Sequence, residues 1–489
     1  MSILEVGSET TAQAAPAQWT ETTRLLCAAA YTDGTFAQEV IEQVVEEEHR
    51  AVQVPPGVDA VPVIKHCLAA LAQKTLRDRV LAADLVLAVL FTVGTGSAVF
   101  LVLGFLLAWA VVAYDVWTGT HRVVTKQLNA RAFDPAQAPI VGDPDLARRA
   151  EEILERQAGN LAVYSGFLPF AGAGFDLGGW SFVVDLRKGK EEAGHRSTPQ
   201  PVELLDLYAR VEEALLALGM SNLTIEERVF VNGTDIRDDR TLLPAPTGRP
   251  SAGIGDAEMQ RFVVAPSHRI RHYKCIRVTD WRGELVLSLF LRFAVANGRL
   301  FCEMSGFLLT PLKPELHRSD AIPAEPELKD LARLARSSLA SAIPLWLRSP
   351  SVVLRPLMRQ RRRTKLLKRV KRDAFFDYGA AVTVLDRVRS PDYSRYFQLL
   401  DKEMYVKVLE RAILDTIVEV LDTHNIDTSE LAERRSTIIN NGIMVPGGSV
   451  QAESIAVGAG ARIVNRMTRT KQPATSSGPG GGGGGGRNA

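Results

Sequence analysis

The stretch Leu81–Trp117, LAADLVLAVLFTVGTGSAVFLVLGFLLAWAVVAYDVW, decides how the rest of this chain is arranged. No charged residue lies between Asp84 and Asp115, so the neutral run is well above the roughly 18 residues that are typical of a transmembrane helix. A buried helix of a water-soluble core is rarely uncharged on all sides over such a length. The sequence therefore predicts a membrane-bound protein.

This neutral run is too long for one upright helix, which would be about 45 Å long against a hydrocarbon core of about 30 Å. Gly94 and Gly96 predict a break between a shorter arm, 81–93, and a longer arm, 98–117. Basic residues flank both ends, and such flanks stay in the cytoplasm, which favours a helical hairpin over a single long, tilted helix. The residues expected at the membrane span are Leu85, Gly94, Gly96, Phe105, Trp109, Tyr114 and Trp117, the last two at headgroup level.

Composition places further bounds on the chain. Its 489 residues, 46% of them hydrophobic, are enough for two or three domains with cores of their own. A net charge of +2 indicates no class of partner. The four cysteines are scattered, which is typical of reduced thiols in the cytoplasm, and the N-terminus lacks the apolar core of a signal peptide.

Changes of periodicity and composition predict an α+β fold in which a membrane segment carries a cytoplasmic body of antiparallel sheet and helices. The predicted regions are 1–20 disordered, 21–80 N-terminal helical, 81–117 transmembrane or hairpin, 143–320 an α+β domain, 328–372 an amphipathic and Arg-rich segment against the membrane, 373–435 helical, 436–466 a Gly-rich β-arch or self-association segment, and 467–489 a disordered tail.

A Gly-rich loop, GFLPFAGAGFDLGG, joins the predicted strands 160–165 and 180–186. Its glycines invite a nucleotide-binding interpretation, but the third is out of register for G-x-G-x-x-G and a strand rather than a helix follows, so a long hairpin loop is favoured. With the predicted helix Val202–Leu218 and the stretch RVFVNGTDIRDDRTLL, residues 160–243 resemble the ubiquitin-like β-grasp family. That resemblance implies an interaction module and supplies no catalytic residue.

Three further strands, 270–280, 285–293 and 299–309, predict an antiparallel meander, with Asn297-Gly298 as a hairpin turn. His268, His272, Cys275 and Cys302 fall close to this region, but their spacing does not match a metal site, and ordinary strand and loop positions are favoured. Asp235 and Asp238 lie among arginines in a loop and are interpreted as a solvated surface. No catalytic residue, metal or cofactor is assigned.

Two charged segments stand out. Five glutamates between Glu39 and Glu48 form either a docking surface or, as favoured, a solvated helix face. MRQRRRTKLLKRVKR follows the predicted amphipathic helix 331–347, and we expect it to lie on anionic lipid headgroups; nucleic acid is the alternative, disfavoured because no stacking aromatics are interleaved. The residues expected at the membrane surface are Arg359, Arg361, Arg362, Arg363, Lys365, Lys368, Arg369, Lys371, Arg372 and Trp346.

The order of these features resembles an uncharacterised family of membrane-associated proteins from high-GC bacteria. The stretches that carry the resemblance are RLLCAAAYTDGTF, YSGFLPFAGAGFDLGGWSFVVDLRKGKE, RHYKCIRVTDWRGELVLSLFLRF and LDKEMYVKVLE. The resemblance implies no activity. We expect a scaffold or regulatory protein on the cytoplasmic side of the cell membrane, with an unidentified protein partner or a second copy of itself. An enzyme with a site in the α+β domain and a membrane-tethered nucleic-acid binder remain the alternatives.

Overall fold

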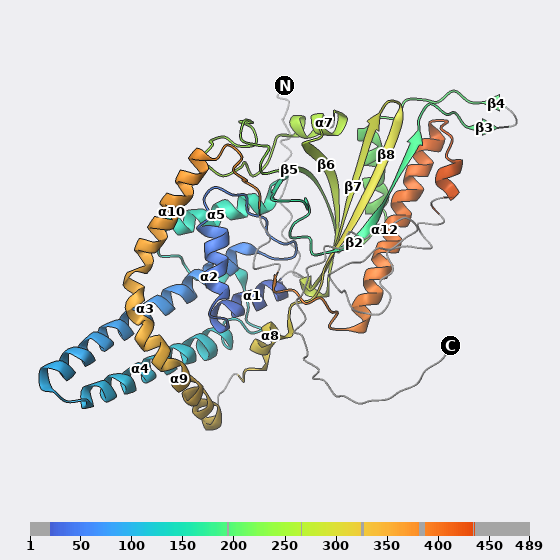
Figure 1. The fold of residues 1–489 in the computed structure, drawn as a ribbon. Coiled ribbons are helices and arrows are strands. Elements are labelled where there is room, and N and C mark those ends of the chain that lie inside the picture. Colours follow the sequence, from blue (N-terminus) through green and yellow to red (C-terminus); the bar gives the residue numbers. More distant parts are fainter. Residues whose placement is uncertain are drawn as a thin grey trace, which may run out of the picture.

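The computed structural model describes residues 20–192, 195–265, 267–323, 327–380, 387–433 and 435. Within these residues the chain is a mixed α+β protein built around one six-stranded sheet (Figure 1). The predicted α+β class is therefore confirmed. The segments expected to be disordered or Gly-rich, 1–20 apart from Thr20, 436–466 and 467–489, lie outside the described residues.

The sheet has the strand order β1-β5-β6-β7-β8-β2, and only β1 and β5 pair in parallel. The predicted meander is confirmed as β6, β7 and β8, and β7 turns into β8 at Asn297 and Gly298, which have positive φ angles of 53° and 70°. The strands are β1 Leu161–Tyr164, β2 Phe175–Asp185, β5 Leu223–Asn232, β6 Ile270–Asp280, β7 Leu285–Ala296 and β8 Arg299–Leu309, and β3 Glu191–Glu192 with β4 His195–Arg196 forms a separate small hairpin.

The expected hairpin between β1 and β2 is wrong, and with it the basis of the β-grasp resemblance. β1 pairs with β5 and β2 pairs with β8, at opposite edges of the sheet. The Gly-rich loop therefore crosses the sheet from one edge to the other. Its Phe170 is buried in an aromatic cluster, stacked on Phe290 at 4.0 Å and edge-on to Phe230 at 5.1 Å between ring centroids. Burial of this ring, rather than a tight turn, decides the path of the loop.

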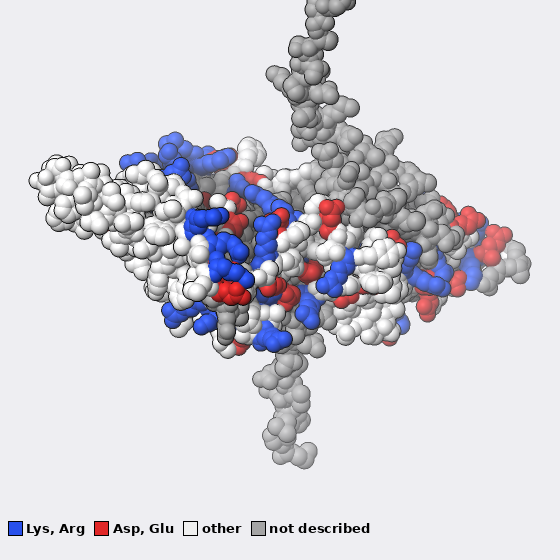
Figure 2. Space-filling view, turned by 90° about the horizontal axis from the view of Figure 1, so that it is seen from below, with Lys and Arg blue, Asp and Glu red and all other residues white. Residues whose placement is uncertain are grey.

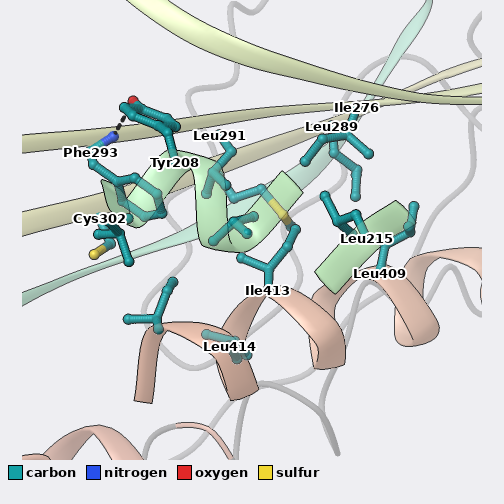
Figure 3. Close-up of a cluster of buried hydrophobic side chains, with 14 of the residues drawn as sticks. Tyr208, Leu215, Ile276, Leu289, Leu291, Phe293, Cys302, Leu409, Ile413 and Leu414 are labelled. Carbon is teal, nitrogen blue, oxygen red and sulfur yellow. Dashed lines mark hydrogen bonds between the residues drawn. The ribbon is translucent and has the colours of Figure 1, made fainter. Parts of the chain in front are cut away.

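Two helices cover the opposite face of the sheet. They are α6, Leu204–Leu216, and α12, Tyr396–Thr423, whose apolar side chains interdigitate with those of β6, β7, β8 and β2 (Figure 3). The Tyr208 hydroxyl accepts a 2.7 Å hydrogen bond from the backbone N–H of Phe293 within this core. α12 is the strongest helix that periodicity predicts in 373–435, and its burial against α6 explains that periodicity.

The N-terminal helices form a second core that surrounds the start of the long helix α3. α3, Ala60–Thr95, begins at Asp59, whose side chain accepts from the N–H of Val61. Around it pack α1 Thr20–Thr32, α2 Phe36–Val40 with a π-helical continuation Ile41–Val45, and α5 Pro144–Ala158. Smaller elements are the π-helix Thr118–Val124, α7 Asp256–Val264 and α8 Pro314–His317.

The far half of α3 leaves this core and returns as α4, Val99–Trp117, after Gly96 adopts a left-handed conformation with φ 72°. The pair projects from the body as a hairpin (Figure 1). α9, Leu328–Arg348, packs on α4, and α10, Arg355–Arg372, continues along the same side of the body. The helix break expected at Gly94 and Gly96 is therefore present.

Removal of the Phe170 ring should destabilise the whole sheet. Phe170→Ala deletes a buried aromatic and should lower the free energy of unfolding by about 3–5 kcal/mol. Phe167, in the same loop but 98% exposed, supplies the control, because Phe167→Ala should change stability by less than about 0.5 kcal/mol. Chemical denaturation of the purified full chain measures both, and equal losses would contradict the buried position of Phe170.

Stability should also depend on pH through Glu410, which is buried on the inner face of α12. Burial raises the pKa of its carboxyl to about 7. Between its ordinary pKa of about 4.5 and 7 the folded chain binds more protons than the unfolded chain, so stability should fall as the pH rises through this window, by about 3 kcal/mol in total. Glu410→Gln should abolish this component, which thermal unfolding between pH 5 and 8 measures against the unsubstituted chain.

Candidate membrane-binding surface

The hairpin of α3 and α4 exposes large apolar side chains on all its outer sides. Figure 2 shows it as a lobe that carries no acidic or basic side chain over its projecting part. Val93, at its tip, is 79% exposed. The other members are between 37% and 61% exposed: Val86, Leu87, Val89, Leu90, Phe91, Val99, Leu101, Val102, Leu103, Leu106 and Leu107. A contiguous apolar surface of this kind marks a protein, ligand or membrane contact.

The two arms differ in length but neither is long. From Asp84 to Thr95 the first arm rises about 17 Å, and from Val99 to Asp115 the second rises about 24 Å. α4 with the following π-helix, Val99–Val124, is by length and composition a candidate membrane-spanning helix among the described residues. Both arms are shorter than a hydrocarbon core of about 30 Å, so the tip of the hairpin would end within that core.

Helix α9 completes this unit by crossing the hairpin. The indole Nε1 of Trp109 donates a 2.9 Å hydrogen bond to the carbonyl oxygen of Ala335. Trp346 is 7% exposed and packs beside Phe105, with 6.3 Å between ring centroids. At Gly104 the helices approach so closely that a Cβ atom would lie 2.8 Å from the Cβ of Ala88 and 3.1 Å from the Trp346 ring. A small residue is therefore required at this crossing.

Ion pairs fix the base of the hairpin. Arg77 of α3 contacts Asp115 of α4 at 2.9 Å and its neighbour Asp78 at 2.8 Å. Arg355, at the start of α10, contacts the other oxygen of Asp78 at 2.8 Å. Asp78 is buried and Asp115 is nearly buried, so these ion pairs hold α3, α4 and α10 together at the base of the hairpin.

The Arg-rich helix α10 has an inner and an outer stripe. Its inner stripe carries Arg359 and Arg363, which face the body, and ends in the buried Val370. Its outer stripe repeats at intervals of three and four residues and is exposed. This stripe starts with apolar Leu357 and Met358 and continues with basic side chains. The basic members of the outer stripe are Arg361, Lys365, Lys368 and Arg372.

Three of the arginines expected at the membrane pair instead with the glutamates of the N-terminal helices. Arg359 contacts Glu46 at 3.3 Å, Arg362 contacts Glu42 at 3.5 Å, and Arg363 contacts Glu48 at 3.8 Å. The glutamate cluster is thus a docking surface whose partner is in the same chain. Six of the nine basic residues make no ion pair within the described residues: Arg361, Lys365, Lys368, Arg369, Lys371 and Arg372.

The other residues singled out in the sequence are placed as follows. Leu85, Phe105 and Trp109 lie on the faces that α3, α4 and α9 share, Tyr114 and Trp117 are exposed at the hairpin base, and Gly94 and Gly96 lie at its tip. Trp346 lies within the helix crossing rather than on an outer surface. No cluster of metal-ligating side chains forms among the described residues. The Nε2 atom of His272, one of the residues weighed as a metal ligand, lies 3.7 Å from Oε2 of Glu227.

Residues 179–451 match the model of the AbeC-like domain. This region covers more than half of the chain. The chain belongs to the AbeC-like domain family. Neither curated proteins nor solved structures gave a match.

The AbeC-like domain contains most of the sheet, α6, α12 and the pair α9–α10. The hairpin and the N-terminal helices precede it. The helices that contact the hairpin, α9 and α10, therefore belong to the family domain, whereas the apolar lobe does not.

A side chain at Gly104 should separate α9 from the hairpin. Gly104→Val forces the three helices apart, at a cost of about 1–3 kcal/mol, and should speed tryptic cleavage after Arg333 and Arg336 in α9 by at least about fivefold. Gly94→Val is the control, because nothing lies within 4 Å of its Cβ position. Unchanged cleavage in detergent-solubilised Gly104→Val protein would contradict the close crossing.

Proposed function

We propose that this protein is a membrane-anchored scaffold whose hairpin enters the membrane from one side and whose AbeC-like domain presents interaction surfaces beside it. The observation that carries the proposal is the uncharged lobe of exposed apolar side chains on α3 and α4. Full burial of each such side chain is worth about 1.5–3 kcal/mol, so a dozen of them strongly favour an apolar solvent over water. The short arms favour entry and return on the same side of the membrane.

The arrangement of α9 and α10 supports the same orientation. Both lie on the side of the body from which the hairpin projects (Figure 1). α9 exposes Ile343 and Leu347, and the outer stripe of α10 passes from apolar to basic side chains. An interfacial helix has this composition, and each basic residue near an anionic leaflet contributes about 1 kcal/mol. If the chain is bacterial, as the sequence resemblance implies, the surface is the cytoplasmic face of the cell membrane.

Two features favour a scaffold over an enzyme. All four cysteines are buried, and burial raises the pKa of each thiol, that of Cys275 to about 11, so none is a ready nucleophile near neutral pH. β2 is an edge strand of eleven residues that pairs only with β8 among the described residues. An edge of this length offers a partner a row of backbone donors and acceptors.

Partition of the full chain after cell lysis tests the anchor. The protein should remain with membranes during alkaline carbonate extraction. Val93→Asp combined with Leu103→Asp places two charges in the lobe, each costing about 2.5–3.5 kcal/mol in the bilayer, and should shift most of the protein to the soluble fraction. Leu154→Asp, at a position 53% exposed on α5 of the body, should leave the partition unchanged. A soluble, monodisperse unsubstituted chain without detergent would refute the proposal.

The sidedness can be read with a single introduced cysteine, because the native thiols are buried. Ile140 is exposed, and an Ile140→Cys protein should react with an impermeant maleimide only after the cells are opened. Labelling in intact cells would overturn the cytoplasmic orientation. Salt-sensitive retention on DNA, lost when Lys365 and Lys368 are changed to Glu, together with a soluble protein would instead support the nucleic-acid alternative.

A further inference from the structure

A cleft lies between the sheet and the segment that leads into α3. Its floor is the face of β5, β6 and β7, and its walls are the segment Gln53–Pro56 and the loop residues Gly172 and Ala173. A smaller hollow adjoins it beside the end of α5, and the two share Gln53 and Arg228. The cleft therefore sits where the N-terminal helices meet the sheet, away from the apolar lobe.

Positive charge is in excess in this cleft. Arg228 and Arg277 line the cleft and Arg156 lines the adjoining hollow, whereas Glu226 is the single carboxylate among the described residues that line either. One oxygen of Glu226, Oε2, accepts from Arg228 Nε and from Arg277 Nη1, each at 3.0 Å. Although burial opposes it, the two guanidinium groups lower the pKa of Glu226, so this carboxylate stays ionised and neutralises only one of the arginines.

Polar atoms without partners point to a ligand. Arg277 Nε and Ser288 Oγ are buried and make no hydrogen bond, and their residues are 8% and 1% exposed. Gln53 Oε1 is also buried without a partner, and a turn of its amide would present an N–H group instead. Buried polar groups in native proteins are nearly always paired, so the three unpaired atoms around this cleft need partners from ordered water or from a bound ligand.

The size of the cleft limits what that partner is. The cleft holds about 60 Å³, and one water-sized sphere needs about 10–15 Å³, so roughly four to six heavy atoms fit. A phosphate, sulfate or acetate ion has this size, whereas a whole nucleotide would extend out of the cleft. Ordered water would satisfy the hydrogen bonds but would leave the excess positive charge.

We propose that the cleft binds a small oxyanion, phosphate or carboxylate, through Arg277, Ser288 and Arg228. The guanidinium groups supply charge-assisted hydrogen bonds, and the Ser288 hydroxyl supplies a neutral donor. The segment Gln53–Pro56 leads directly into α3, so the anion ties the hairpin helix to the sheet. This site is independent of whether the hairpin enters a membrane.

Calorimetric titration of the detergent-solubilised full chain with inorganic phosphate and with acetate, at constant ionic strength, tests the site. At least one ion should bind, and at a concentration a hundredfold above its Kd should raise the melting temperature by about 3 °C or more. Ser288→Ala should weaken binding about tenfold, as expected for loss of one hydrogen bond to a charged ligand. Arg277→Gln should weaken it further, and Arg277→Lys should restore part of it.

Arg187→Gln is the matched control, because this arginine is exposed beside Asp185 and distant in the fold from the cleft. It should bind the ion as the unsubstituted chain does. Circular dichroism of each variant separates loss of binding from loss of folding, and Ser288→Ala carries the test where Arg277→Gln fails to fold. The proposal would be overturned if neither phosphate nor acetate bound at concentrations from 100-fold the protein concentration up to about 50 mM. It would also be overturned if Arg187→Gln weakened binding as much as Ser288→Ala does. A preference for phosphate or for acetate decides between the two ligand classes.

Discussion

The charge cluster at the base of the hairpin is the interaction on which the arrangement of this protein depends. The apolar lobe lies outside the core but must still be attached to it. Arg77 and Arg355 make this attachment through ion pairs with Asp78 and Asp115. Removal of one partner from such a buried group leaves an uncompensated charge, which is more costly than the pair is favourable. The base of the hairpin is therefore polar and rigid, and the outer part is apolar and free of charge.

The intramolecular pairing of α10 changes the meaning of two charged segments. Separately, the glutamates near Glu46 and the arginines near Arg362 indicate two external partners. Together they hold α10 across the N-terminal helices, although each exposed ion pair stabilises the fold by only about 0–1 kcal/mol. The buried side chain of Val370 anchors the far end of α10 in the core. The basic side chains of the outer stripe stay exposed and make no ion pair among the described residues.

Sequence patterns predicted the parts of this fold that local chemistry determines. The hairpin follows from the absence of charge between Asp84 and Asp115, and the meander follows from alternation and the Asn297-Gly298 turn. The crossing loop was not predictable, because the glycines suggest a turn while the burial of Phe170 depends on rings from four distant strands. The pairing of Arg362 with Glu42, the burial of Trp346 and the arginine cleft likewise depend on residues far apart in the sequence.

The order of the elements along the chain also has a consequence for biosynthesis. α9, which covers the helix crossing at Gly104, is translated about 210 residues after α4 ends. At 5–20 residues per second the ribosome needs roughly 10–40 s to produce it, and during this time the hairpin has no intramolecular cover. The nascent chain therefore exposes more apolar surface than the finished chain does, because the face of the hairpin that α9 covers stays open until the family domain has been translated.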